Sequence, residues 1–94
     1  MNKQMIDKLK KLQKEMMEAQ ERIELSEFTG RATGVVVIMQ GTRQVLDVKI
    51  SKDLLEDIEI LQEAILLAVN DALAQIENKT QETMGKYANP GIGF

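Results

Sequence analysis

Apolar residues recur at helical spacing along the first part of the chain. They step alternately by four and three residues, which is the pattern of a helix with one apolar seam of the coiled-coil type. The seam consists of Met5, Leu9, Leu12, Met16, Ala19 and Ile23. Lysine, glutamine and glutamate, all good helix formers, fill most positions between them, and no glycine or proline precedes Gly30. The pattern predicts a helix over residues 1–25.

The period changes in the middle of the chain. Residues 35–39 are all apolar, lie between two glycines and are too few for a helix, so they predict a strand. Apolar and charged residues then alternate along residues 46–50, which is typical of a strand with one face in water. A short strand before Gly30 completes an antiparallel three-stranded meander over residues 27–50, with the stretch GTRQ as one hairpin connection.

A second amphipathic helix is predicted over residues 53–84. Its broad apolar face consists of Ile58, Leu61, Ile65, Ala68, Val69, Ala72, Leu73 and Ile76. Asp53, with Glu56 three residues later, fits a capping box at the start of this helix. Asp57 is a second candidate cap.

The predicted fold is α+β, in the order α-β-β-β-α, with a small antiparallel three-stranded sheet between two long helices. Gly85 is expected to end the second helix and to leave residues 85–94 as a C-terminal tail. The 94 residues are expected to form one small domain. A domain of this size with little aromatic surface often needs a partner subunit for its stability.

The glycines in EFTGRATGVVVIMQG, residues 27–41, raise the question of a phosphate-binding loop. Such a loop presents backbone N–H groups at the start of a helix, and a P-loop also needs a lysine followed by Ser or Thr. Here Gly34 leads into a strand and no such pair follows in the loop. The glycines are therefore interpreted as bends of a small sheet, and no small-molecule substrate is expected.

Composition narrows the possible chemistry. The chain has no cysteine and no histidine, so it lacks thiol nucleophiles, the common metal ligands and the usual general base. Asn70 and Asp71 interrupt an apolar helix, and we interpret them as hydrogen-bonding partners of a strand or loop. We expect no enzyme, no metal and no other cofactor. The first residues are polar and no apolar run approaches the roughly 18 residues of a membrane span, so a cytoplasmic protein is expected.

Charge is sorted into blocks along the chain, although its net value is only −3. Residues 1–14 carry five lysines and one aspartate, whereas residues 53–77 carry seven acidic residues and no basic one. The basic block fits contacts to duplex phosphates without base readout. An ordinary coiled-coil helix with solvated lysines is the alternative interpretation. The candidate DNA-binding residues are Lys3, Lys8, Lys10, Lys11, Lys14, Lys79 and Lys86.

Three stretches resemble the YbaB/EbfC family of bacterial nucleoid-associated proteins. They are LKKLQKEMMEAQERIE, TGRATGVVVIMQG and LDVKISKDLLEDIEILQEAILLAVNDALAQI, and the ending PGIGF is similar to the Pro-Gly ending of many members. Thr33-Gly34 departs from the consecutive glycines that members often carry there. The resemblance covers nearly the whole chain. It implies a tweezers-like homodimer in the nucleoid that binds duplex DNA, alters its conformation and contributes to nucleoid organisation and gene regulation.

The apolar seam of the first helix and the apolar strand over residues 35–39 supply candidates for the core or the dimer contact. These candidates are Met5, Leu9, Leu12, Met16, Val35 and Val37. Two other functions remain open from the sequence. The order helix, hairpin, helix is similar to a prefoldin subunit, a coiled-coil holdase module that needs longer helices than this chain predicts. The acidic block over residues 53–63 is also compatible with an adaptor that binds another protein.

Overall fold

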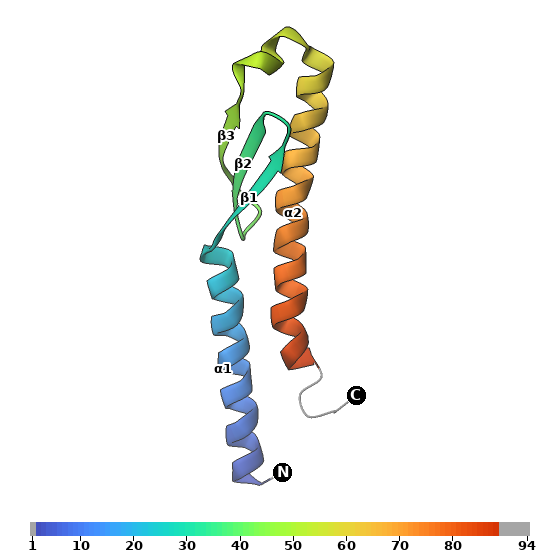
Figure 1. The fold of residues 1–94 in the computed structure, drawn as a ribbon. Helices are drawn as coiled ribbons and strands as arrows, with labels where there is room; N and C mark the ends of the chain where they lie inside the picture. The colour runs from blue at the N-terminus through green and yellow to red at the C-terminus, as the bar shows by residue number, and fades with distance from the viewer. Residues whose placement is uncertain (1, 89–94) are drawn as a thin grey trace.

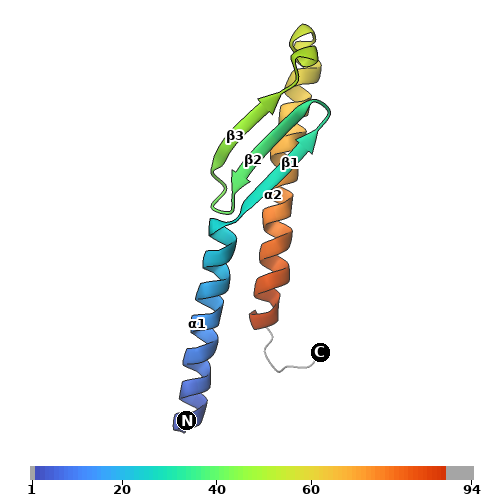
Figure 2. The same ribbon diagram turned by 60° about the vertical axis from the view of Figure 1, so that its left-hand side comes forward.

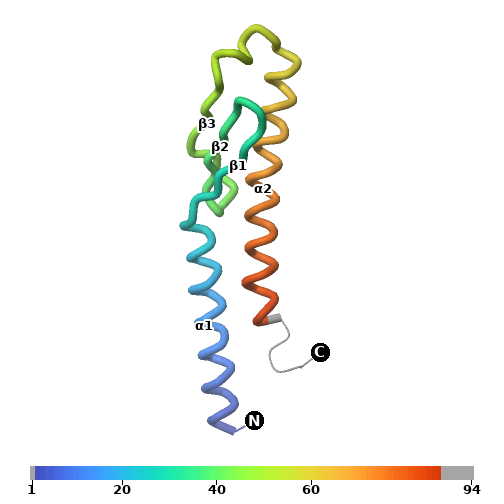
Figure 3. Tube along the Cα trace, in the orientation of Figure 1, coloured from blue at the N-terminus to red at the C-terminus, as the bar shows by residue number. Residues whose placement is uncertain are grey.

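The computed structural model describes residues 2–88 and confirms the predicted α-β-β-β-α order (Figure 1). Its elements are helix α1 (Lys3–Leu25), strands β1 (Glu27–Ala32), β2 (Val35–Gln40) and β3 (Val45–Ile50), the short 3-10 helix η1 (Lys52–Glu56) and helix α2 (Ile58–Ala88). The Cα trace runs up α1, through the sheet to η1, and back down along α2 (Figure 3). The two helices are therefore antiparallel.

The molecule is a rod rather than a ball. Its Cα radius of gyration is 19.0 Å and its principal extents are 68 × 26 × 11 Å. A compact domain of this length has a radius of gyration of about 12 Å. The accessible surface is 7110 Å², whereas a compact monomer of this mass exposes about 5,500 Å². The fold therefore leaves an unusually large surface for contacts with other molecules.

The sheet has the strand order β1-β2-β3, with both pairs antiparallel. Helix α2 lies across one face of β1 and β2, and Figure 2 shows β3 on the side of the sheet away from the helix. Alternate residues of β2 point toward α2, so Val35, Val37 and Met39 are almost completely buried. These three side chains are the centre of the core because they lie on the middle strand beneath the helix.

Small residues allow β1 to approach α2 closely. A Cβ atom at Gly30 would overlap the carbonyl oxygen of Ala68 and the backbone nitrogen of Ala72. Ala64, Ala68 and Ala72 are spaced four residues apart, so their short side chains form one flat face of the helix. The strand therefore packs directly against the backbone of α2.

Two polar side chains of α2 bind the outer edge of β1. The backbone N–H of Arg31 donates to Asp71 Oδ2 at 2.9 Å, and Gln75 Nε2 donates to the carbonyl oxygen of Thr29 at 2.7 Å. Gln75 Nε2 also lies 3.3 Å from Asp71 Oδ2. This contact confirms the predicted structural role for Asp71, whereas the neighbouring Asn70 is exposed. Edge strands present unpaired backbone groups, and these bonds satisfy two of them.

Strand β3 differs from its prediction. The alternating pattern predicted one buried face, but all six of its residues are exposed, including Val48 at 44% and Ile50 at 40%. The strand pairs with β2 in the expected antiparallel manner. Its apolar side remains uncovered because α2 packs mainly on β1 and β2 within the sheet.

Both ends of the second helix also differ from the prediction. Asp53 and Glu56 lie in η1, so they do not cap the long helix. The second candidate is confirmed, because Asp57 Oδ1 accepts a hydrogen bond from the backbone nitrogen of Ile60 at 3.2 Å. Helix α2 passes through Gly85 to Ala88, since one helical glycine costs only about 1 kcal/mol. The rest of the predicted tail, residues 89–94, lies outside the described residues.

Candidate nucleic-acid interface

The antiparallel helices bring two distant groups of lysines to one end of the rod. The first half of α1 and the last turns of α2 lie at the same end, away from the sheet (Figures 1 and 2). We call residues 2–14 and 78–88 together the basic end. Its lysines are Lys3, Lys8, Lys10, Lys11 and Lys14 from α1 and Lys79 and Lys86 from α2, and all seven are exposed. The five lysines of α1 lie on the half of that helix that extends beyond α2, whereas Lys79 and Lys86 lie on the part of α2 that runs beside the glutamate-rich second half of α1.

The start of α1 adds to the positive potential of this end. Asn2 caps the helix, with its Oδ1 accepting a hydrogen bond from the backbone nitrogen of Met5 at 2.8 Å. The first turn contains no acidic residue, so the partial positive charge of the helix N-terminus is not offset there. Lys14 lies 4.0 Å from Glu18, but both side chains are exposed. Such a pair contributes at most about 1 kcal/mol, which leaves Lys14 available to a stronger anionic partner.

The predicted seam residues fall into two groups. Val35 and Val37 are fully buried beneath α2, so within one chain they belong to its core. Met5 and Leu9 are 54% and 47% exposed because the first turns of α1 extend beyond the end of α2. Leu12 and Met16 are half-buried. The seam of α1 is therefore covered near the sheet and open near the basic end.

Arg22, which was not among the residues selected from the sequence, lines the same hollow as Lys79. Arg22 and Lys79 line a hollow of about 410 Å³ between α1 and α2, together with Ser26, Phe28 and Thr83. Its position close to the sheet extends the basic surface toward the middle of the rod. The sequence signal was weak because Arg22 stands alone among the glutamates of residues 15–27. Only the packing of the two helices brings it next to Lys79.

The opposite end of the rod is acidic. Helix η1 and the first turns of α2 lie at the tip beyond the sheet (Figure 1). Residues 53–63 in this region carry five acidic side chains and no lysine or arginine. The acidic residues are Asp53, Glu56, Asp57, Glu59 and Glu63. We call residues 53–63 the acidic end, and its distance from the basic end makes the rod electrically polar.

Between residues 2 and 88, no group of three or more acidic side chains is placed to hold a metal ion. None of the helices in this range combines the length and apolar character needed to cross a membrane. The basic end is accordingly the candidate site with the clearest chemical character.

Comparisons with known proteins agree with the geometry. The sequence model of the YbaB/EbfC DNA-binding family matches residues 1–91. A nucleoid-associated protein of Enterococcus faecalis is 42% identical over an alignment of 94 positions that covers 96% of this chain and 90% of that protein. One from Ligilactobacillus salivarius is 39% identical over 94% of this chain and 90% of its own length. The crystal structure of an uncharacterized Helicobacter pylori protein shares the fold, with a TM-score of 0.75 at 24% identity over 94% of this chain and 98% of that chain.

Proposed function

Because the chain belongs to the YbaB/EbfC DNA-binding family, we propose that it is a nucleoid-associated protein that binds duplex DNA mainly through phosphates. The observation that carries this proposal is the group of five exposed lysines on the first turns of α1, to which Lys79 and Lys86 of α2 add positive charge toward the sheet. Binding there alters DNA conformation and contributes to nucleoid organisation and gene regulation. The family is one of DNA-binding proteins rather than enzymes, as expected from the sequence.

The shape of the molecule explains how a chain of net charge −3 binds DNA. Electrostatic interactions in physiological salt are screened over about 8 Å. The rod is 68 Å long, so DNA at the basic end does not experience repulsion from the acidic end. The local charge decides the interaction, and residues 2–14 alone carry a net charge of +4. Each phosphate neutralised releases counterions, so the affinity falls steeply with salt.

The proposal includes a homodimer paired through the side of the sheet at β3. This strand is an open edge, and its apolar side chains Val48 and Ile50 are exposed. Leu66 of α2 is exposed as well. The chain exposes about 1,600 Å² more surface than a compact monomer of its mass, and a standard interface covers about 800 Å² per partner. Pairing here leaves two basic ends free to hold one duplex.

The acidic end supports a second candidate function, an adaptor that binds a basic protein. Leu55 and Ile58 are both exposed among the carboxylates, so this tip combines negative charge with apolar surface. Such a complex buries apolar area and loses less affinity with salt than a phosphate complex does. Capture of a protein that survives moderate salt, together with no DNA binding at low salt, would favour this function.

A fluorescence-anisotropy titration with a duplex of about 30 base pairs, at low and moderate salt, tests the DNA proposal. The test variant is Lys10→Glu with Lys14→Glu, at the basic end. The matched control is Arg31→Glu with Lys52→Glu, which makes the same change of net charge at exposed residues outside both the basic end and β3. We expect the test variant to lose at least about tenfold in affinity and the control less than about threefold.

A fourfold variant, with Lys3, Lys10, Lys11 and Lys14 all changed to Glu, should abolish binding while the dimer persists in light scattering. Equal losses for the test and control variants would indicate a general charge effect. Unchanged affinity in the fourfold variant would exclude the basic end as the DNA site.

A further inference from the structure

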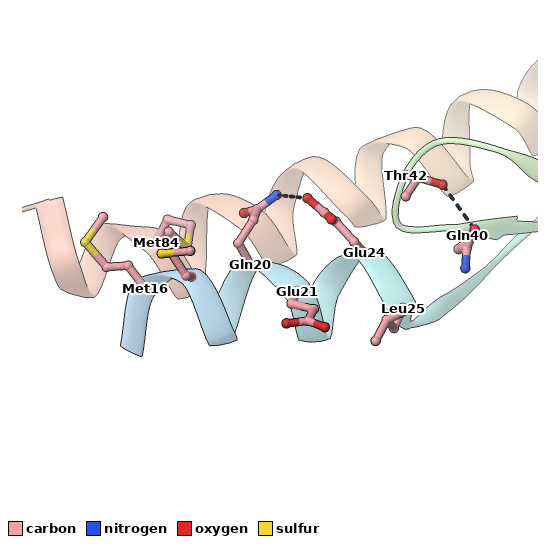
Figure 4. Close-up of a pocket in the computed structure, with 9 residues that line it drawn as sticks. Met16, Gln20, Glu21, Glu24, Leu25, Gln40, Thr42 and Met84 are labelled. Atoms are coloured by element: carbon pink, nitrogen blue, oxygen red, sulfur yellow. Dashed lines mark hydrogen bonds between the residues drawn. The ribbon is translucent and has the colours of Figure 1, made fainter. Parts of the chain in front are cut away.

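A groove rich in methionine lies between α1, the last turns of α2 and the turn after β2 (Figure 4). Its volume is about 640 Å³. We call it the Met groove, and its lining residues are Met16, Met17, Gln20, Glu21, Glu24, Leu25, Gln40, Thr42 and Met84. Met17 and Leu25 are 72% and 67% exposed, so the groove presents open apolar surface. Methionine side chains adapt readily to a helix that packs against them.

The charged side chains that line the Met groove are all negative. Glu21 and Glu24 of α1 line the groove, and Figure 4 shows Glu24 pointing toward α2 and Glu21 pointing away from it. The amide of Gln20 donates to Glu24 Oε1 at 3.3 Å, which holds that carboxylate at the wall. Among the described residues that line the groove, none is a lysine or arginine. Its chemistry therefore suits a helix with an apolar stripe flanked by positive charges.

The first three turns of α1 have this chemistry. We call residues 3–14 the α1 arm. Met5, Ile6 and Leu9 are exposed on it, and they lie within about 100° of one another around the helix. Five lysines lie in the same stretch, of which Lys8 borders the stripe on one side and Lys10 on the other, while the remaining three lie farther round the helix. The arm is thus a basic amphipathic helix whose apolar side is uncovered in the single chain.

The α1 arm cannot enter the Met groove of its own chain. Helix α1 is continuous from Lys3 to Leu25, so Leu9 and Glu21 are held about 18 Å apart along one axis. We propose that the Met groove receives the α1 arm of a second copy, with Met5 and Leu9 inserted between the methionines and the lysines facing Glu21 and Glu24. The match of both charge and apolar character selects this occupant.

The contact has consequences that pairing through β3 does not have. An arm in a groove is heterologous, so each copy offers one arm and one groove, and successive copies join head to tail. The arm also carries five of the seven lysines of the basic end. DNA and the Met groove therefore compete for the same segment, and DNA binding releases the contact. The contact itself forms without DNA and is tested without it.

Photo-cross-linking identifies the occupant directly. The chain has no cysteine, so Met17→Cys places a single benzophenone label in the groove. Labelled protein is mixed with a nitrogen-15 copy, irradiated without DNA and digested for mass spectrometry. We expect cross-links to peptides containing residues 5–9 of the isotopic copy, and fewer of them when duplex DNA is added. Asn70→Cys, exposed on α2 outside the groove, is the matched control.

Three cross-linking results would overturn the proposal. They are attachment to residues 89–94, attachment only within the same copy, or a yield at Met17→Cys no higher than at Asn70→Cys.

Sedimentation velocity at rising protein concentration provides the second test. Leu9→Glu removes the apolar contact of the arm, and Glu21→Lys with Glu24→Lys reverses the charge of the groove. Both should weaken assembly beyond the dimer at least tenfold, whereas Leu67→Glu, the same substitution on α2 outside the groove, should not. A wild-type mass that does not rise with concentration, or equal behaviour of all variants, would refute the contact.

Discussion

The two halves of α2 are held in different ways. The first half, taken as residues 58–76, packs its alanines against Gly30 and binds the edge of β1 through Asp71 and Gln75. The second half, residues 77–88, forms an exposed ion pair with Arg43 through Glu77 and otherwise lies alongside α1 with its lysines exposed. One half therefore determines whether the domain folds, and the other determines what it binds. Substitutions at the basic end should change binding without unfolding the protein, and substitutions beneath the first half should do the opposite.

The largest effect is expected at the close contact of β1 with α2. Gly30→Val places side-chain atoms where the Ala68 carbonyl and the Ala72 nitrogen already lie. Overlap with backbone atoms cannot be relieved by rotating a side chain, so we expect a loss of at least about 3 kcal/mol. Small domains have about 5–15 kcal/mol in total, and a marginal one would unfold. Circular dichroism during thermal denaturation measures this loss, and a variant that melts like the wild type would contradict the contact.

A smaller loss is expected at the edge of β1. Asp71→Ala removes the acceptor of the Arg31 N–H and leaves that donor without its partner. Such a loss costs about 1–3 kcal/mol. Asn70→Ala changes the neighbouring exposed residue and should stay within about 0.5 kcal/mol. Urea denaturation of the two variants separates the contact from the general effect of an alanine in this helix, and equal midpoints would show that the bond is unimportant.

The second half of α2 should respond to substitution in the opposite direction. A Cβ atom at Gly85 would meet no atom within 4 Å apart from its chain neighbours and the backbone of its own helix, in contrast to Gly30. Gly85→Ala should therefore raise stability by up to about 1 kcal/mol, because alanine is the better helix former. Thermal denaturation followed at 222 nm measures the gain. A destabilised Gly85→Ala variant would show that the two halves of α2 are packed alike.

The smallest effect on global stability is expected at the start of α1. Asn2→Ala removes the bond to the Met5 nitrogen and costs the local helix about 1 kcal/mol. The first turns of α1 have no packing against α2, so they can fray while the rest of the fold remains intact. We expect faster amide hydrogen exchange over residues 3–6 and an unchanged unfolding midpoint. A lower midpoint would mean that the arm belongs to the cooperative unit.

Periodicity was sufficient to predict the elements and their order. The seams of both helices and the apolar run of β2 are long enough to define their own period. Gly85 was misplaced as a helix end because propensity is a weak signal where a helix is exposed. The exposure of β3 was missed for a different reason. Alternation shows which side of a strand is apolar, but only the position of α2 shows whether that side is covered.

The candidate site was predicted in part. Sequence charge selected all seven lysines, but their convergence depends on the two helices running antiparallel. Arg22 and the Met groove were missed because their residues come from segments far apart in the chain. Met16 and Met84 are adjacent only through the packing of α1 on α2. A contact between residues of different elements produces no periodic pattern in the sequence by which it could be predicted.

The hydrogen bonds from Asp71 and Gln75 also set a limit on growth. A sheet has two edges, and in this molecule the outer groups of β1 at Thr29 and Arg31 are already occupied. Only the β3 edge can accept another strand, so the sheet can pair with one further strand and no more. Strand pairing therefore stops after two chains and cannot propagate into a fibre. By holding its own first strand, α2 limits pairing between sheets to a single partner.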